Sequence, residues 1–412
     1  MKYCNCKVTG KKIPIILNYG SMPIANDFSK VIKINKKNNY NMQVAFNKEN
    51  GIFQLVDAPK PKKLFNKNYA FLSSTSNNMT NHFKSVANKI KKKFKKKKFK
   101  IMEIGCNDGI FLQNFKSLPH LGIEPSKNVF KISKSKGLKV INSFFEKKLI
   151  DKEKLKKNFD VIFAANVICH IPDITALFNN IELSLKDEGV FIFEEPYLGD
   201  VIEKTSYDQI YDEHYYLFSI NAIQSILKNM NLEVFDAERI PTHGGSVRYY
   251  IQKKNVRKKS KNLLNILKYE KKIGITKIST IKKFAKKCLL SKKKILQTIK
   301  KIKDKKIKVY GYGATSKSTT IINFCGLKSN SIDGIFDTSP TKIGGYAPGT
   351  SIPIIDYKKF EEVKPKYCIL FAWNHYLEIF KKEKNKNIIW LTHIDKKFFD
   401  KKNRKNIIAP SL

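Results

Sequence analysis

Arginine is scarce in this chain, although the chain is strongly basic. Its 412 residues carry 80 basic against 35 acidic side chains, a formal net charge of +45, yet the arginines are only Arg239, Arg248, Arg257 and Arg404. Arginine is the side chain that most often reads base edges in nucleic-acid grooves. Lysine, asparagine and isoleucine are abundant together, a composition typical of AT-rich genomes. Nucleic acid is therefore not favoured as the partner.

The chain also lacks a disulfide framework and a long apolar run. Its seven cysteines show no spacing typical of a disulfide scaffold, which favours a reducing compartment. No run approaches the roughly 20 apolar residues of a membrane span, and the N-terminus has no secretory apolar core. We therefore expect a cytoplasmic protein with no membrane partner. The length suffices for two or three domains.

Half of a zinc site is missing from the N-terminal segment. Cys4 and Cys6 open the chain, but Asn47 and Asn50 stand where a small zinc lobe would carry its second cysteine pair. Neutral amides are poor zinc ligands. We predict that residues 1–68 form a small β-rich lobe held by apolar packing, and we expect no metal.

A strand, a tight turn and an amphipathic run follow one another at residues 100–115. The turn is glycine-spaced, Glu103-Ile-Gly-Cys-Asn-Asp-Gly109, and Glu124 ends the next apolar run about 20 residues on. Glycines let a ligand approach the backbone, and an acid at that second position holds ribose hydroxyls. The pattern resembles motif I of class I S-adenosylmethionine (SAM) methyltransferases. That resemblance implies a SAM site made by Glu103, Gly105, Asn107, Asp108, Gly109 and Glu124; the alternative is a plain strand–helix turn.

Strands and helices alternate from residue 100 onward, which predicts a methyltransferase domain over 69–253. A helix is expected over 173–186 and another over 219–230. Five βα units followed by a strand pair favour a doubly wound α/β sheet whose last strand inserts antiparallel. The expected strands are 100–105, 120–124, 138–142, 159–165, 189–195, 231–239 and 247–252.

Residues 254–412 predict a helical linker and a second Rossmann-like domain. A lysine-rich helical pair over 254–306 precedes the turn Gly311-Tyr-Gly313-Ala-Thr-Ser-Lys317, and apolar runs at 352–355, 366–372 and 387–391 extend a parallel sheet. Backbone N–H groups of that turn, with Lys317, suit a pyrophosphate. A third glycine is missing, so NAD is not favoured.

Polar clusters follow the fourth and fifth predicted strands, where an open α/β sheet binds ligands. One is Tyr211-Asp-Glu213-His214, in which a histidine beside a carboxylate suits a base with an orienting partner. The alternative is a polar turn that caps the next helix. The others are Asn166 to Asp173 with His170, where Asp173 suits a helix cap, and His243-Gly-Gly-Ser-Val-Arg248, where Arg248 suits an anion or solvent.

These stretches together resemble the sugar C-methyltransferases that act on nucleotide-linked deoxysugars, the group of the TDP-sugar 3-C-methyltransferases. The resemblance implies an N-terminal zinc lobe, a central SAM domain and a C-terminal Rossmann-like domain, and Asn47 and Asn50 depart from it at the zinc. The matching stretches are Gly20 to Asn26, Glu103 to Gly109, Tyr211 to His214, His243 to Ser246, Gly311 to Ala314 and Phe371 to Asn374.

The resemblance implies C-methylation of a nucleotide-diphosphate keto-deoxysugar. We separately expect the protein to be a monomer. By position, His214 is the base that removes a proton beside the ketone, with Glu213 as its neighbour. A neutral-pH base suits histidine, whose ordinary pKa is near 6.5. The rivals are O- or N-methylation of another acceptor and methylation of RNA. The sugar-lining residues that the resemblance implies are Tyr69, Asn166, His170 and Tyr211. The substrate-binding residues that we predict are His243, Arg248, Gly311, Gly313 and Lys317.

Overall fold

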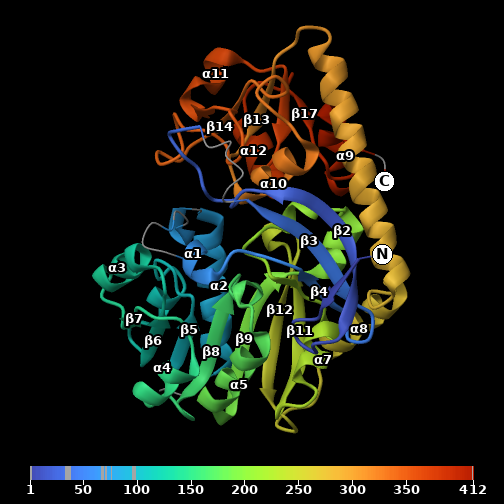
Figure 1. The fold of residues 1–412 in the computed structure, drawn as a ribbon. Helices are drawn as coiled ribbons and strands as arrows, with labels where there is room; N and C mark the ends of the chain where they lie inside the picture. The colour runs from blue at the N-terminus through green and yellow to red at the C-terminus, as the bar shows by residue number, and fades with distance from the viewer. Residues whose placement is uncertain are drawn as a thin grey trace.

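Three sheets organise the chain. The computed structural model describes residues 2–32, 39–65, 69, 72–75, 77–94, 99–410 and 412. In Figure 1 the blue N-terminal strands lie between the central domain at the bottom and the C-terminal domain at the top. The long helix α9 (Ile278–Lys303) runs along the side of the molecule and joins the two. The predicted lobe boundary at residue 68 lies outside the described residues.

The N-terminal lobe is an antiparallel sheet with the strand order β1-β2-β3-β4-β10. Its own strands alternate buried and exposed side chains or are buried outright, and Met42, Val44 and Phe46 form its centre. The predicted β-rich lobe is confirmed. Its fifth strand, β10, comes from the central domain, and two residues are too few to give a sequence pattern. The strands are β1 (Tyr3–Asn5), β2 (Lys12–Met22), β3 (Tyr40–Asn47), β4 (Ile52–Leu55) and β10 (Tyr216–Leu217).

The central sheet has the strand order β11-β12-β9-β8-β5-β6-β7. Strands β5 to β9 are parallel, and β12 inserts antiparallel between β9 and β11. This order confirms the predicted doubly wound sheet and its terminal hairpin. The strands are β5 (Ile101–Ile104), β6 (His120–Ile123), β7 (Val140–Ile141), β8 (Phe159–Ala165), β9 (Leu185–Pro196), β11 (Leu232–Ile240) and β12 (Ser246–Lys253).

Helices cover this sheet, but the one predicted directly after Gly109 is only a 3-10 turn, Leu112–Phe115. Its apolar run is fully buried, and Pro119 follows, which disfavours helical geometry at the residue before it. The predicted Asp173 cap is present, because its carboxylate accepts from the Ala176 N–H. The helices are α1 (Pro61–Leu64), α2 (Asn77–Lys93), α3 (Lys127–Ser135), α4 (Lys147–Lys152), α5 (Ile174–Ser184), α6 (Leu198–Lys204) and α7 (Ile220–Leu227).

The C-terminal domain is a second, all-parallel sheet with the order β15-β14-β13-β16-β17-β18. The second Rossmann-like domain predicted from the sequence is thereby confirmed. Among the described residues, no helix is both long enough and apolar enough to cross a membrane. The elements are α8 (Lys261–Ile273), β13 (Val309–Tyr312), α10 (Ser316–Cys325), β14 (Gly334–Asp337), β15 (Ile354–Asp356), α11 (Phe360–Val363), β16 (Tyr367–Leu370), α12 (Tyr376–Lys382), β17 (Ile389–Leu391) and β18 (Ile407–Ile408).

Candidate active site

A cavity of about 1700 Å³ lies at the carboxyl ends of the central strands, where open α/β sheets bind their ligands. All three parts of the chain line it. Asn26 comes from the N-terminal lobe, Glu124 and His214 come from the central domain, and Lys317 and Asn374 come from the C-terminal domain. The cavity is therefore enclosed by all three parts of the chain.

The turn after β5 forms one end of the cavity. Gly105 has a φ of +67°, and a Cβ there would overlap a methyl group of Val167. The Glu124 carboxylate accepts from the Asn107 N–H at 2.9 Å and from the Ser126 N–H at 2.8 Å. Burial raises the pKa of Glu124, although these hydrogen bonds oppose the shift. The turn and the acid are thus tied to each other and face the cavity together.

The six predicted SAM residues divide into two groups. Gly105, Asn107 and Glu124 line the cavity. The other three lie behind this wall and shape it. Glu103 is buried, which raises its pKa well above its usual range. The Asp108 carboxylate accepts a hydrogen bond from Ser74 and forms an ion pair with Lys136. Gly109 lies so close to Leu138 that a Cβ on it would overlap that side chain.

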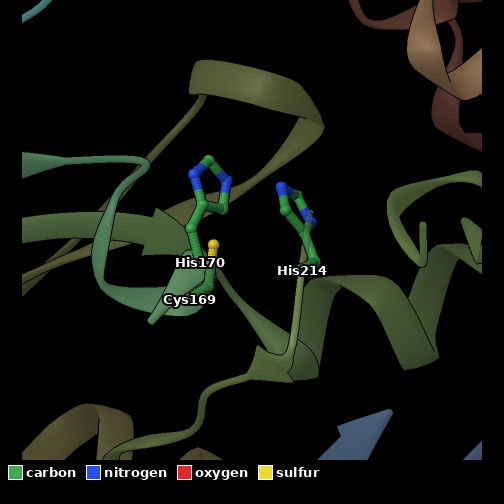
Figure 2. Close-up of side chains that lie close together, drawn as sticks. All are labelled: Cys169, His170 and His214. Carbon is green, nitrogen blue, oxygen red and sulfur yellow. The ribbon is translucent and has the colours of Figure 1, made fainter. Parts of the chain in front are cut away.

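His214 stands in the middle of the cavity wall with one ring nitrogen committed. Its Nδ1 lies 2.7 Å from the Gln209 carbonyl oxygen, so Nδ1 carries the proton and Nε2 has the free lone pair. Figure 2 shows its ring beside that of His170, with ring centroids 5.3 Å apart. The Tyr211 ring lies 4.1 Å away on another side. Burial lowers the pKa of His214 well below 6.5, which keeps the imidazole neutral.

Glu213 beside it is held by two residues from elsewhere in the chain. The Asn26 amide donates to the Glu213 carboxylate at 2.7 Å, and the Tyr69 hydroxyl also bonds this carboxylate. Asn26 in turn accepts from the Ser316 hydroxyl of the C-terminal domain at 2.8 Å. Burial raises the pKa of Glu213 to about 7. The carboxyl is therefore an acid or a base within reach of neutral pH.

A polar wall opposite the turn joins the central and C-terminal domains. Asn166 follows β8 with a φ of +54°, and its amide nitrogen lies 3.1 Å from His243 Nε2. Lys317 donates to the His243 carbonyl and to Asn374 Oδ1, both at 3.4 Å. Burial lowers the pKa of Lys317 to about 8, although nearby Asp208 opposes the shift. This wall offers a cation and several hydrogen-bonding groups to a ligand.

Three residues predicted to bind substrate are not in the cavity lining. Arg248 is buried and forms ion pairs with Glu194 at 2.6 Å and with Glu238 at 2.5 Å. Its guanidinium is therefore paired with carboxylates of the protein itself. Gly311 packs against Phe371, and Gly313 turns the backbone beside Ala372 with a φ of +89°. Their contacts give the strand–turn–helix its shape. His243 and Lys317 are the two predicted substrate residues that the structure brings into the cavity.

Sequence reasoning missed residues that hold this site from behind. Glu195, at the end of β9, accepts from three consecutive backbone N–H groups, those of Val167, Ile168 and Cys169, at 2.6 to 3.1 Å. It thereby fixes the turn that presents His170. Burial raises the pKa of Glu195 to about 7. The only sequence signal was an acidic doublet at the end of an apolar strand, which does not tell one carboxylate from the other.

One group of side chains in the described part of the chain has the composition of a metal site. Ligand atoms of Cys169, His170 and His214 lie within 4.8 Å of one another (Figure 2). A tetrahedral zinc needs ligand atoms about 3.3 to 3.8 Å apart and a thiolate. Burial raises the pKa of the Cys169 thiol well above its usual range, which opposes the thiolate. We assign no metal to this group.

The N-terminal lobe does not fit the structural zinc that the family resemblance implies. Asn47 Oδ1 accepts from the Glu49 N–H at 3.0 Å and Asn50 Oδ1 accepts from the Ile52 N–H at 3.1 Å. Asn47 and Thr9 hydrogen-bond the Cys6 sulfur. Both amides are thus used in turns, and only one cysteine pair remains to bind a metal.

Comparisons with known proteins agree with this architecture. Residues 71–237 match the methyltransferase domain model, and residues 241–390 match the C-methyltransferase C-terminal domain model. The C-methyltransferase NovU of Streptomyces niveus is 26% identical over 288 residues, which is 69% of this chain and 69% of NovU. The alignment with a Pyrococcus horikoshii protein of known structure covers 45% of this chain and 95% of that protein, with 14% identity and a TM-score of 0.37. A possible histamine N-methyltransferase of Thermotoga maritima covers 42% of this chain and 90% of its own, with 16% identity and a TM-score of 0.33.

The sheet order, the cavity at its carboxyl edge and the matched central domain define a SAM-dependent methyltransferase. SAM fits the residues present, since Glu124 offers carboxylate oxygens to hydroxyl groups and Gly105 leaves the backbone open. The matched C-terminal domain narrows this class. Together with the similarity to NovU, it indicates that the chain is a SAM-dependent C-methyltransferase.

Proposed function

We propose that this enzyme methylates a carbon atom next to the ketone of a nucleotide-activated deoxysugar. The observation that carries the proposal is the state of His214: a neutral, buried imidazole whose Nδ1–H is held by a carbonyl and whose Nε2 is free in the cavity. A carbon next to a ketone becomes a nucleophile only after a base removes its proton. O- and N-methylation use lone pairs that are already present.

His214 acts as the general base in this proposal. Its Nε2 takes the proton from the sugar carbon, the C–H electron pair moves into the enolate, and the ring becomes an imidazolium. SAM, held by Gly105, Asn107 and Glu124, supplies the methyl group to that carbon. The Gln209 carbonyl then stabilises the imidazolium through its bond to Nδ1. We assign to Glu213, whose pKa is about 7, the return of the site to its starting protonation.

The enolate oxygen needs fixed hydrogen-bond donors. Tyr69, Tyr211 and Asn166 line the same cavity and offer two hydroxyls and an amide. Donors that are already aimed at developing negative charge contribute most to catalysis, up to about 3–4 kcal/mol for one donor. His170 is neutral, because burial lowers its pKa to about 3, and it supports the sugar as an uncharged ring.

The C-terminal domain supplies the groups that suit the nucleotide diphosphate. Lys317 lines the cavity and its charge acts on His214, and Asn374 and His375 lie beside it. A buried ammonium is worth more to a phosphate than an exposed one because water screens it less. The relative NovU is named as a C-methyltransferase. The nucleotide-sugar substrate is our proposal for this chain and is not part of that name.

Product analysis tests the proposal. The enzyme is incubated with SAM labelled with ¹³C in its methyl group and with a panel of nucleotide-activated keto-sugars. The proposal expects one substrate class to gain a labelled methyl whose carbon resonance shows a bond to carbon. A label bonded to oxygen or nitrogen would instead establish the rival O- or N-methyltransferase.

The acid limb of the pH profile follows from the lowered pKa of His214. A base must be neutral, and a histidine with a lowered pKa stays neutral to a lower pH than usual. We expect kcat to be unaffected as the pH falls through 6.5 and to decline only below it. Steady-state kcat at saturating substrate measures this limb. A half-maximal kcat at or above 6.5 would contradict a desolvated His214 as the base.

The basic limb should appear in KM for the nucleotide sugar. Lys317 is protonated below its pKa of about 8 and neutral above it, so KM is expected to rise as the pH passes through about 8. Lys317→Arg keeps its charge at every pH and should remove this rise. Lys308→Arg, on an exposed residue, serves as the control and should keep it. If KM still rises near pH 8 in Lys317→Arg, a titrating group other than Lys317 causes the rise.

A further inference from the structure

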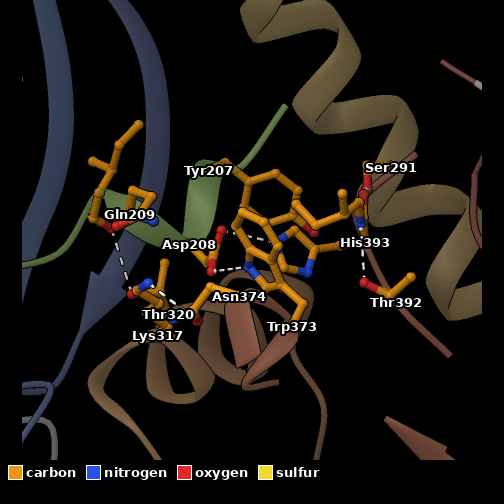
Figure 3. Close-up of polar contacts among 12 residues, drawn as sticks. Tyr207, Asp208, Gln209, Ser291, Lys317, Thr320, Trp373, Asn374, Thr392 and His393 are labelled. Atoms are coloured by element: carbon orange, nitrogen blue, oxygen red, sulfur yellow. Dashed lines mark hydrogen bonds and ion pairs between the residues drawn. The ribbon is translucent and has the colours of Figure 1, made fainter. Parts of the chain in front are cut away.

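Two residues of the C-terminal domain, Trp373 and His393, bond the buried carboxylate of Asp208 in the central domain (Figure 3). We propose that Asp208, clamped by Trp373 and His393 of the C-terminal domain, positions the Gln209 carbonyl and so fixes the orientation and tautomer of His214. This inference rests on the proposed role of His214 as the base. It makes Asp208, Trp373 and His393 positioning residues of the reaction, although none of them lines the cavity.

The clamp is short, dry and made across two domains. Trp373 Nε1 donates to Asp208 Oδ2 at 2.7 Å, and His393 Nε2 lies 2.8 Å from Asp208 Oδ1. Asp208 is completely buried, and Trp373 and His393 expose at most 5% of their surface. Tyr207, the residue before Asp208, packs its ring on His393 with centroids 4.9 Å apart. Each carboxylate oxygen of Asp208 has its own partner, so the loss of either partner leaves one buried oxygen without its hydrogen bond. The two contacts together therefore hold Asp208 in one position.

Asp208 remains ionised in this setting. Burial alone would raise its pKa, but the charge and hydrogen bond of His393 and the hydrogen bond of Trp373 lower it. Lys317 adds a nearby positive charge. The clamp is therefore charge-assisted, and such hydrogen bonds are stronger than neutral ones.

Gln209 passes this constraint on to the site. It follows Asp208 in the same 3-10 turn (Tyr207–Gln209), its carbonyl accepts from His214 Nδ1 at 2.7 Å, and its side-chain amide donates to the His243 carbonyl. His243 contacts Asn166 in turn. Gln209 thus contacts both the His214 loop and the His243 loop, which face the proposed sugar site.

A separate contact places Trp373 against the second of these loops. Gly244 has a φ of +89°, and a Cβ there would overlap the far edge of the Trp373 ring. The same indole that holds Asp208 therefore also supports the backbone next to His243. In this proposal the C-terminal domain lines the part of the cavity that binds the nucleotide. Through the Trp373 ring it also positions the loops that carry His214 and His243.

Trp373→Phe tests the inference, because it removes the N–H that holds Asp208 while an aromatic ring stays at the position. It also removes the part of the indole that packs against Gly244, a loss of ring volume that the control variant shares. We expect kcat to fall about tenfold to a hundredfold, as for a base displaced by less than about 1 Å, while the Kd for SAM is unchanged. The chain has two tryptophans, and Trp390→Phe is the matched control, because Trp390 packs on Tyr312 and Phe380 away from the cavity. It should retain kcat.

Two readouts separate positioning from simple loss of folded enzyme. In ¹⁵N spectra His214 should show the Nδ1–H tautomer in the wild type and in Trp390→Phe, and a mixture with Nε2–H in Trp373→Phe. The acid limb of the kcat profile should move to still lower pH in Trp373→Phe, because the hydrogen bond to the Gln209 carbonyl raises the pKa of His214 and the variant weakens that bond. Inactive, misfolded enzyme would lower kcat at every pH, but it would change neither the tautomer of His214 nor the pH of the acid limb.

The outcomes distinguish this inference from the proposed function. If His214→Ala is inactive but Trp373→Phe keeps the wild-type kcat, pH limb and tautomer, the clamp is structural only and the inference is wrong. If His214→Ala is active, the proposed base itself is wrong. Should Trp373→Phe fail to fold, Gly244→Ala is measured in its place against Gly326→Ala, which has a φ of +69° and open space around it. The same loss of kcat and shift in pH limb are expected only at Gly244.

Discussion

The His214→Ala enzyme is expected to bind SAM with the affinity of the wild type and to transfer no measurable methyl group. General base catalysis contributes about 10²–10⁴-fold, and a carbon acid offers no alternative lone pair. SAM binding should survive, because the turn at Gly105 and the acid Glu124 are held by their own backbone contacts. Calorimetry gives the Kd for SAM, and single-turnover assays give the rate of transfer.

His120→Ala is the control for this experiment. His120 begins β6 at the amino end of the strand, away from the cavity, and bonds the Leu118 carbonyl through Nδ1. It should keep full activity. A His214→Ala enzyme that turned over at the wild-type rate would remove His214 from the mechanism.

A methyl group at Gly105 is expected to weaken SAM binding by about 10- to 100-fold. In Gly105→Ala the new Cβ would overlap Val167, in a backbone with a φ of +67° that side chains rarely adopt. Overpacking and backbone strain each cost about 1–3 kcal/mol, and about 1.4 kcal/mol is tenfold in affinity. Relief of the overlap requires Val167 or the turn itself to shift. Titration of SAM against the variant measures the loss.

Gly137→Ala separates strain from crowding in this comparison. Gly137 has a similar φ of +76°, but nothing lies within 4 Å of its Cβ position. The variant should lose some stability and keep its affinity for SAM. Equal losses of affinity in the two variants would show that crowding at Gly105 has no special part in cofactor binding.

The repeating local patterns of the fold were predictable from the sequence. Buried parallel strands are continuous apolar runs, so β5, β8 and β13 and the turns after them were recognisable without any long-range information. The two-residue strand β10 and the short 3-10 turn after Gly109 were not, because pairing partners and burial decide them. Arg248 likewise looked available for a ligand until its two carboxylate partners were in place.

The site divides in the same way. His214 and Glu213 stood next to each other in the sequence and after a strand, which marked them as candidates. Their supports are remote: Asn26 lies 187 positions from Glu213, and Trp373 lies 165 positions from Asp208. One sequence carries no signal that links such positions. The groups that line the cavity were therefore predicted better than the groups that hold them in place.

Deuterium loss tests the central claim most directly. A nucleotide keto-sugar deuterated at the carbon to be methylated is turned over with SAM, beside a control without enzyme and one with the His214→Ala enzyme. C-methylation by His214 predicts that each product molecule gains a methyl group and loses the deuterium of the bond that His214 breaks, and that the variant yields no product. A methylated product that retains all its deuterium would contradict the account, because the methyl group would then sit on an atom that needed no deprotonated carbon.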